Sequence, residues 1–269
     1  MGRHDAARFG DQTQAMFRLD GRVAFVSAAP GHLGSAMTRA LCGAGAHVIV
    51  NARDDAKLAV FEGTLRDEGF SVERAAFDVA DAAKARAFFA SRERLHILVN
   101  NAIAMTPKPF AALEPADFAD TYASSVTAAF EMVRAARPAL KASGQGSIVN
   151  ISSMYGLVSP DRRLYANPDQ ASPFHYGPAK AALIQLTRHL AAELGPENIR
   201  VNALVPGPFP RAEVQAKDPD FAGRLAARTM LGRLGQPAEI AGPLLFLASQ
   251  ASSFMTGQAL TVDGGWTAW

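Results

Sequence analysis

Short apolar runs alternate with longer amphipathic stretches along the chain from Gly21 onward. The runs "RVAFVS" (22–27) and "HVIVNA" (47–52) are almost continuously apolar, which is typical of strands buried on both faces of a parallel sheet. Each run is followed by a stretch with helical spacing of its apolar residues. This pattern predicts an α/β fold: one doubly wound domain with a mainly seven-stranded parallel sheet and helices on both faces. A closed βα barrel is the second fold that the pattern allows.

The boundaries of the predicted elements follow from the same alternation. A long helix is expected from about 115 to 140, because Pro115 suits a first helical turn. Residues 1–16 lack the pattern and are expected to form a flexible tail. Residues 17–269 are expected to form one domain, since no Gly/Ser-rich linker or repeat interrupts them. The predicted strands are 22–27, 47–52, 71–78, 95–100, 146–152, 199–205 and 259–265.

Composition excludes several classes of function. The 27 Lys and Arg residues nearly balance the 25 Asp and Glu residues and are scattered, so no nucleic-acid partner is expected. No window approaches the ~18 consecutive apolar residues of a membrane span, and the first residues do not resemble a secretory signal. Cys42 is the only cysteine and lies in an apolar helical pattern, which predicts a core position, no disulfide and a cytoplasmic protein. The histidines show no metal-ligand spacing, so no metal is expected.

The loop after the first predicted strand suits a dinucleotide. In "VSAAPGHLGSAM" (26–37), glycines let a backbone approach closely, and a helix N-terminus offers free N–H groups to a pyrophosphate. An ordinary strand–helix turn is the alternative interpretation. The cofactor-binding residues expected here are Ser27, Gly31, His32, Leu33 and Gly34.

The end of the second predicted strand bears on the choice of cofactor. An acidic residue there usually holds the ribose hydroxyl of NAD, but "NARDD" places Arg53 there after two neutral residues. A guanidinium suits a 2′-phosphate, so we expect NADP, with NAD as the alternative. Arg53 could also be a solvated residue, whereas Asp54 and Asp55 are interpreted as charges at a helix N-terminus.

Several further segments resemble, in order, the motifs of the short-chain dehydrogenase/reductase family, single-domain type. The resemblance extends from Leu19 to Trp269 and implies a Rossmann fold. The segments are "DVAD" (78–81), "LVNNAI" (98–103), "GSIVNISS" (146–153), "YGPAK" (176–180), "IRVNALVPG" (199–207), "GRLGQPAEIA" (232–241) and "SSFMTGQALTVDGG" (252–265).

The resemblance assigns roles to individual residues. It implies that Ser153, Tyr176 and Lys180 are catalytic and that Tyr176 and Lys180 also contact the cofactor. The other cofactor-binding residues that it implies are Asp78, Val79, Asn100, Asn101, Ala102, Pro206 and Gly207.

Tyr176 and Lys180 stand one helical turn apart, and this spacing has a chemical reason. A phenol has a pKa of ~10, so it exchanges protons poorly at neutral pH. A nearby ammonium favours the phenolate, and we therefore expect Lys180 to lower the pKa of Tyr176. Tyr176 would then give a proton to a carbonyl oxygen as hydride arrives, while Ser153 holds that oxygen. The alternative is an i,i+4 surface pair.

The chain departs from the family pattern at several places. Ala28 replaces the first glycine of the phosphate loop, and Pro30 removes one N–H donor. Ser125 stands where the family often has an asparagine of a proton relay, so we assign Ser125 to the catalytic group with an altered relay. Arg211 lies near the place of a threonine that contacts the nicotinamide carboxamide.

An insertion separates two of the implied catalytic residues. Ser153 and Tyr176 are 23 positions apart, whereas relatives have about thirteen. We expect "PDRRLYANPDQASPF" (160–174) to lie over the substrate pocket, with Arg162, Arg163 and Tyr165 as its reactive groups. His175 is a further candidate substrate residue. A solvated loop or a subunit contact is the alternative.

Together these features predict an NAD(P)-dependent oxidoreductase that interconverts a secondary alcohol and a ketone. A sugar, a sugar acid or another polyhydroxylated molecule is the candidate substrate. The resemblance implies a homotetramer, with contacts through the helices that contain 115–140 and Tyr176. Trp266 and Trp269 are expected at a subunit interface. The alternative function is a catalytically decayed dinucleotide-binding sensor or scaffold.

Overall fold

The computed structural model describes residues 10–167 and 171–269, and its centre is a seven-stranded parallel sheet. The strand order is β3-β2-β1-β4-β5-β6-β7, so the sheet is open at β3 and β7 and is not a barrel. The predicted doubly wound fold is therefore confirmed. The strands are β1 Val23–Val26, β2 His47–Ala52, β3 Val72–Ala76, β4 Ile97–Asn100, β5 Gly146–Ile151, β6 Ile199–Pro206 and β7 Ala259–Val262.

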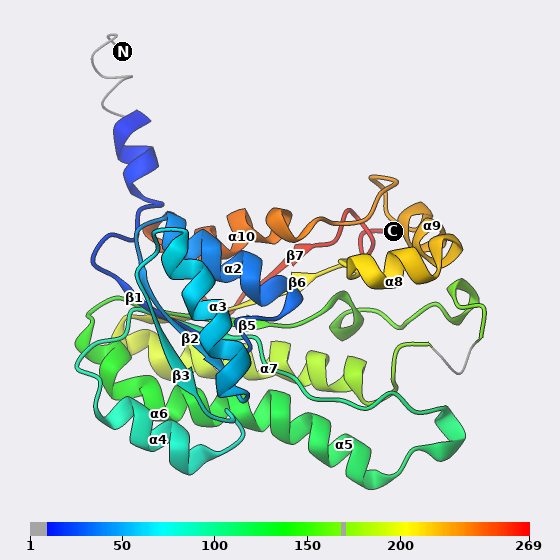
Figure 1. The fold of residues 1–269 in the computed structure, drawn as a ribbon, viewed down its shortest axis with the longest axis horizontal. Helices are drawn as coiled ribbons and strands as arrows, with labels where there is room; N and C mark the ends of the chain where they lie inside the picture. Colours follow the sequence, from blue (N-terminus) through cyan, green and yellow to red (C-terminus); the bar gives the residue numbers. More distant parts are fainter. Residues whose placement is uncertain (1–9, 168–170) are drawn as a thin grey trace.

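Helices cover both faces of this sheet (Figure 1). One layer contains α2, α3 and α10, and the other contains α4, α6 and α7. Strand β6 leads to α8 on the right in Figure 1, where α9 follows. The helices are α2 His32–Gly43, α3 Asp55–Asp67, α4 Ala82–Ala90, α5 Pro115–Tyr122, α6 Ala128–Ala142, α7 Tyr176–Leu194, α8 Ala212–Lys217, α9 Pro219–Ala227 and α10 Ala241–Ala248.

The long helix expected from 115 to 140 contains a change of helix type. It begins at Pro115 as predicted, but five residues, η2 (Ala123–Thr127), form a π-helical turn between α5 and α6. A π turn inserts one residue more per turn and is frequent at functional sites.

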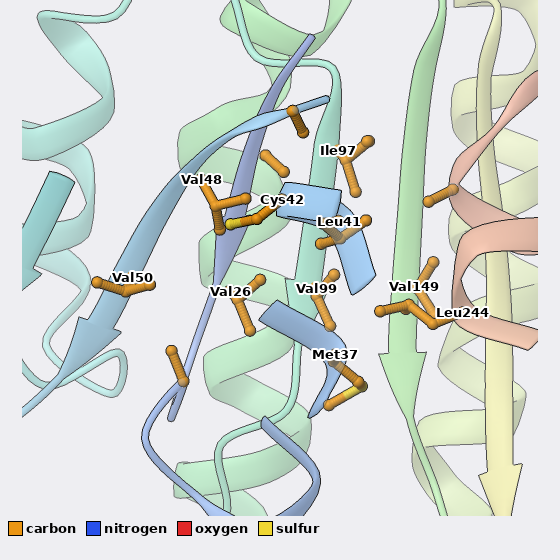
Figure 2. Packing of buried hydrophobic residues seen from close by; sticks show 14 of the residues in the cluster. Val26, Met37, Leu41, Cys42, Val48, Val50, Ile97, Val99, Val149 and Leu244 are labelled. Atoms are coloured by element: carbon orange, nitrogen blue, oxygen red, sulfur yellow. The ribbon is translucent and has the colours of Figure 1, made fainter. Parts of the chain in front are cut away.

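The core beneath α2 and α10 shows how the apolar pattern is used. Figure 2 shows Met37 and Leu41 of α2 over the central strands, with Leu244 of α10 beside them. Cys42 belongs to this cluster, and burial raises the pKa of its thiol to about 12. The predicted core position of Cys42 is confirmed, and an un-ionised thiol is a poor nucleophile.

Two findings concern the chain ends. Within the tail predicted for 1–16, residues 10–15 are helical and exposed, and they extend away from the body of the molecule in Figure 1; residues 1–9 lie outside the described residues. Trp266 is only 3% exposed within its own chain, so its expected place at a subunit interface is wrong, whereas Trp269 is 66% exposed. No helix within the described ranges has the length and apolar character needed to cross a membrane.

The insertion folds onto the C-terminal part of the chain. It contains η4 (Arg162–Leu164), and Leu164 and Tyr165 pack against Phe221 and Leu225 of α9 and against Trp266. The Arg224 guanidinium donates a hydrogen bond to the carbonyl oxygen of Leu164 at 2.6 Å. These contacts anchor the insertion to α9. Residues 168–170, part of the predicted substrate-covering segment, lie outside the described residues.

Candidate active site

The three implied catalytic residues meet at the carboxyl edge of the sheet. Ser153 follows β5, Tyr176 opens α7, and Lys180 lies one turn further along α7. All three line one cavity of about 330 Å³. The lining residues are Ala28, Gly31, His32, Leu33, Gly34, Asn101, Ile103, Ile151, Ser152, Ser153, Tyr176, Lys180, Pro206, Gly207, Phe209 and Arg211.

Two reciprocal hydrogen bonds fix α7 against the end of β5. The Lys180 ammonium donates to the carbonyl oxygen of Ile151 at 2.7 Å, and the Ser152 hydroxyl donates to the carbonyl oxygen of Lys180 at 2.8 Å. Close packing reinforces this contact, since a Cβ on Gly177 would come within 2.8 Å of the carbonyl oxygen of Tyr155. The position of the Lys180 ammonium in the site is thus fixed by the carbonyl oxygen of Ile151, the last residue of β5.

The pKa of Tyr176 differs in direction from the expectation. Burial raises this pKa, and a hydrogen bond between the Tyr176 and Ser153 side chains only opposes the effect. The Lys180 nitrogen lies 5.8 Å from the centroid of the Tyr176 ring and is directed to Ile151. The expected lowering by Lys180 is therefore wrong for the protein by itself, because loss of hydration raises the pKa and Ser153, not Lys180, is the group that opposes this effect. Burial also lowers the pKa of Lys180 to about 8.

The Ser27 hydroxyl shapes the phosphate-type loop from within the protein. It donates to the carbonyl oxygen of Val99 at 3.2 Å and accepts from the N–H groups of Asn101 at 2.8 Å and Ala102 at 3.1 Å. These bonds join the end of β1 to the end of β4. Ser27 thus holds the loop in place, and a direct bond from Ser27 to a cofactor stays a prediction.

The glycines of this loop provide the close approach that a dinucleotide needs. A Cβ on Gly34 would overlap the carbonyl oxygen of Ala28, and a Cβ on Gly31 would lie 3.0 Å from the same atom. Ala28 itself has φ 49°, the left-handed region that favours glycine. The Nε2 atom of His32 is buried with no hydrogen-bond partner among the described residues. This nitrogen is a candidate contact for a cofactor phosphate.

A second cavity of about 180 Å³ continues the first, because Ala28 and Ile103 line both. Arg53, Asp78, Val79 and Ala102 line this second cavity. The two cavities together form an elongated site, as a dinucleotide requires, and the chain's residues therefore fit such a cofactor.

Of the charged residues near the second cavity, Arg53 and Asp78 line it, whereas Asp54 and Asp55 belong to the start of α3. The Arg53 guanidinium lies 3.7 Å from the Asp78 carboxylate, and the Arg53 side chain is 70% exposed. Asp54 accepts a hydrogen bond from the Lys57 N–H and caps α3, and Asp55 forms an ion pair with Arg74. The predicted structural role of Asp54 and Asp55 is confirmed. Arg53 is left available at the mouth.

Ser125 lies in the π-helical turn η2, which packs against α7. Its side chain is buried, and its hydroxyl has no hydrogen-bond partner among the described residues. The neighbouring Ser124 is instead tied to both the N–H and the carbonyl of Ala104. The catalytic role of Ser125 stays a prediction. A buried hydroxyl that lacks a partner among the described residues can hold a water of such a relay.

The candidate substrate residues of the insertion are not brought to the catalytic groups. Arg163 forms an ion pair with Asp161 at 2.8 Å, and Arg162 lines a separate cavity of about 490 Å³ beside Phe174. His175 is fully buried, with its ring 5.9 Å from that of Phe118. None of the three lines the catalytic cavity, because the insertion docks on α9 and the His175 ring faces α5.

Sequence reasoning missed other residues that do line the catalytic cavity. Ile103, Ile151 and Ser152 lie inside the segments 98–103 and 146–153, and Phe209 lies two residues after the segment 199–207. Their position in or beside these motifs was the available signal. In the part of the chain that the structure describes, no three His, Cys, Asp or Glu side chains gather as a metal-ligand set.

Comparisons with known proteins agree with this geometry. Residues 28–267 match the family model described as "Enoyl-(Acyl carrier protein) reductase". The chain is 36% identical to a galactitol 2-dehydrogenase (L-tagatose-forming) from Cereibacter sphaeroides, over 95% of this chain and 99% of the relative. It is 35% identical to a tropinone reductase homolog from Arabidopsis thaliana, over 93% of this chain and 80% of the relative.

A solved structure of a related protein has a similar fold. The gluconate 5-dehydrogenase from Burkholderia cenocepacia, in complex with NADP and tartrate, has a TM-score of 0.85 and 35% identity, covering 95% of this chain and 99% of that one. The motifs, the fold and these relatives lead to one conclusion: the chain belongs to the short-chain dehydrogenase/reductase family.

Proposed function

We propose that this protein is an NADP(H)-dependent oxidoreductase that interconverts a secondary alcohol and a ketone on a polyhydroxylated substrate, such as a sugar or sugar acid. The observation that carries the proposal is the meeting of Ser153, Tyr176 and Lys180 in one cavity with the glycine loop. A proton-transfer group and a cofactor cradle within one cavity suit hydride chemistry.

The cofactor would occupy the two joined cavities. The loop from Ala28 to Gly34 would hold the pyrophosphate, Asp78 and Val79 the adenine, and Pro206 and Gly207 the nicotinamide. Arg53 would pair with a 2′-phosphate at the mouth of the second cavity. When bound, the nicotinamide supplies or accepts the hydride. The NADP complex of the gluconate 5-dehydrogenase relative supports this choice of cofactor.

The chain's own residues would handle the proton. Because burial raises its pKa, the Tyr176 phenol stays protonated and is ready to donate to a substrate carbonyl oxygen. Ser153, hydrogen-bonded to Tyr176, would donate to the same oxygen and fix its position. Lys180, held on Ile151, would orient the cofactor ribose and supply positive charge near the phenol. In the reverse direction, the same groups would remove the alcohol proton.

The proposed substrate class rests on the relatives and on one side chain. A galactitol 2-dehydrogenase and a gluconate 5-dehydrogenase are among the similar proteins. Arg211 is exposed and lines the catalytic cavity, where its guanidinium would pair with the carboxylate of a sugar acid. Sugar acids and polyols are therefore the substrates to test first.

The test has two steps. Cofactor binding is measured by the fluorescence of NADPH and NADH, and turnover is then measured with a panel of polyols, ketoses and sugar acids. We expect tighter binding of NADPH and turnover of at least one panel member. Arg53→Gln should weaken NADPH binding at least ~10-fold and leave NADH binding nearly unchanged.

Tyr176→Phe is the decisive variant for the proton donor. We expect kcat to fall at least ~100-fold while the Kd for NADPH changes less than about twofold, because only the acid–base hydroxyl is lost. Cofactor binding by the wild-type protein without turnover of any carbonyl or alcohol would instead favour the sensor. The strained Ala28 is the observation that keeps this alternative open.

We also propose that the protein is a homotetramer in which α5, α6 and α7 contribute to the subunit contacts. Phe118 on α5 and Phe130 on α6 are large apolar side chains that remain exposed in the single chain. Exposed aromatic residues on neighbouring helices favour burial against another copy.

A further inference from the structure

A small cavity of about 70 Å³ lies at the amino edge of the sheet, the edge opposite to the catalytic site. It opens beside the starts of β1, β4, β5 and β6 and beside the end of α10. The polar side chains that line it are Arg18, Arg22, His96, Gln145, Asn198, Arg200, Ser249, Gln250 and Ser253. Its volume exceeds that of one water molecule and is too small for a sugar or a nucleotide.

The charges of this cavity have one sign. Its lining contains three arginines and no Asp or Glu. Arg18 pairs with Asp20 at the exposed rim. The Arg22 guanidinium bonds to the neutral amide oxygen of Gln145 at 2.9 Å, and Gln250 donates to the same oxygen. The inner arginines therefore have no carboxylate partner in the lining.

Arg200 forms the inner wall. Its Nη2 atom donates to the carbonyl oxygens of Leu247 and Ser249, both at 3.0 Å. Its Nη1 atom donates to the Ser252 hydroxyl at 2.8 Å and to the carbonyl oxygen of Met255 at 3.5 Å, so both terminal nitrogens are bonded to the protein. Burial lowers the pKa of Arg200 to about 10, as expected for a cation that is solvated by dipoles alone. The dipoles hold the guanidinium in place but leave its positive charge uncompensated.

His96 adds a donor of fixed direction. The backbone N–H of Val23 donates to the Nδ1 atom of His96 at 3.0 Å. A neutral imidazole that accepts at Nδ1 carries its proton on Nε2, so Nε2 is a hydrogen-bond donor. Burial and the charges of Arg22 and Arg94 lower the pKa of His96 and keep this neutral form dominant. The cavity thus combines fixed cations with oriented N–H groups.

We propose that this cavity binds a small tetrahedral oxyanion of the phosphate type, with the Arg22 guanidinium and the Nε2–H of His96 as its main contacts. A forked guanidinium matches the geometry of phosphate oxygens, and among the described residues the Arg22 guanidinium has one hydrogen bond, to Gln145. Arg200, whose terminal nitrogens are bonded to the protein, would attract the anion through its positive charge. The site is separate from the cofactor phosphates, which belong to the carboxyl edge of the sheet.

The experiment titrates the purified protein with inorganic phosphate at constant ionic strength, with chloride as the balancing ion. Calorimetry gives the Kd, and thermal unfolding gives the shift in Tm that ligand binding to the native state must produce. Arg22→Gln and His96→Asn should each raise the Kd at least ~5-fold, because one charged contact or one donor is lost. Asparagine at 96 retains an acceptor for Val23 N–H.

Arg66→Gln is the matched control, since it removes an exposed arginine of α3 that lines neither this cavity nor the two cavities of the proposed cofactor site. The proposal requires that this variant bind inorganic phosphate at the wild-type level. Phosphate binding that is lost in Arg53→Gln and kept in Arg22→Gln would assign the anion to the cofactor site and overturn the proposal. Equal Tm shifts in phosphate and chloride would overturn it as well. Should Arg22→Gln not fold, Arg22→Lys, which keeps the charge but lacks the fork, replaces it.

Discussion

At the scale of the residue, Ala28 is the position where the phosphate-type loop departs most clearly from the backbone preference of its sequence. Its φ of 49° lies in the left-handed region, and the carbonyl oxygens of Ala28 and Ala29 lie against Gly34. Non-glycine residues in this region cost of the order of 1 kcal/mol. The loop conformation persists because Asn101 bonds to the loop's first residues, Ser27 and Ala28.

Ala28→Gly should therefore raise the free energy of unfolding by about 1 kcal/mol, because the strain is relieved without loss of a large contact. Urea denaturation measures the change. Ala29→Gly is the control: Ala29 is fully buried and is not among the residues with positive φ, so the same substitution there should lower stability. A destabilised Ala28→Gly protein would contradict the assignment of strain.

Lys180 provides a prediction that depends on pH. Its pKa is about 8 in the native protein and ~10.4 in an unfolded chain, so the unfolded state binds more protons between these values. Lys180 should accordingly contribute a rise of about 1.5 kcal/mol in the free energy of unfolding between pH 8 and ~9.5. Cys42, whose native pKa is about 12 and whose unfolded pKa is ~8.5, contributes a fall of about 1 kcal/mol over the same range, so the contribution of Lys180 is the difference between the wild type and Lys180→Met. Urea denaturation across this range measures the slope. Lys180→Met should reduce the slope, and an unchanged slope would show that Lys180 is not its source.

At the scale of the element, the insertion between Ser153 and α7 acts as a connection to α9. Leu164 and Tyr165 build a small apolar cluster with Met154, Leu225 and Trp266. This cluster links the residue after Ser153 to the C-terminal segment. The insertion is thus an integral part of the packing around the catalytic edge.

Leu164→Ala should lower the free energy of unfolding by about 2 kcal/mol, because a buried leucine is replaced by a cavity in this cluster. Leu157→Ala is the matched control, since Leu157 lies near the same segment but is 45% exposed. The control should change stability by less than about 0.5 kcal/mol. Equal effects of the two substitutions would show that the cluster does not anchor the insertion.

At the scale of the whole molecule, the sheet is covered on both faces but the single chain leaves large apolar side chains exposed. Phe118, Phe130 and Trp269 are among these exposed residues. We expect light scattering after size exclusion to give four times the mass of one chain. The buried Trp266 would then contribute to the chain's own core, and Phe130 to a contact between chains.

Phe130→Glu should shift the protein to a smaller assembly, because a carboxylate would be buried without a partner in the proposed contact. The shift is measured by light scattering at several protein concentrations. Val60→Glu is the control, since Val60 is an exposed apolar residue on α3, in the other helix layer. A tetramer that survives Phe130→Glu would contradict the proposed interface.

The fold and the grouping of Ser153, Tyr176 and Lys180 at one edge of the sheet could be predicted from the sequence. Strands that are apolar at nearly every position can be buried on both faces, and this condition alone predicted the parallel sheet. The spacing of Tyr176 and Lys180 placed both at the start of one helix, and Asp54 was identified correctly as a charge at a helix N-terminus. These features depend on local spacing and on burial, which a sequence states directly.

Four features could be found only from the tertiary structure. The insertion packs on α9, and Trp266 is buried in its own chain. The pKa of Tyr176 is raised and not lowered, and a positively charged cavity surrounds Arg200. Each depends on which distant segments come together: α9 receives Leu164, and the starts of four strands surround one guanidinium. The solvation of an ionisable side chain depends on all the residues that surround it. The sequence therefore shows that residue 176 is a tyrosine, but only the folded structure shows that burial raises its pKa.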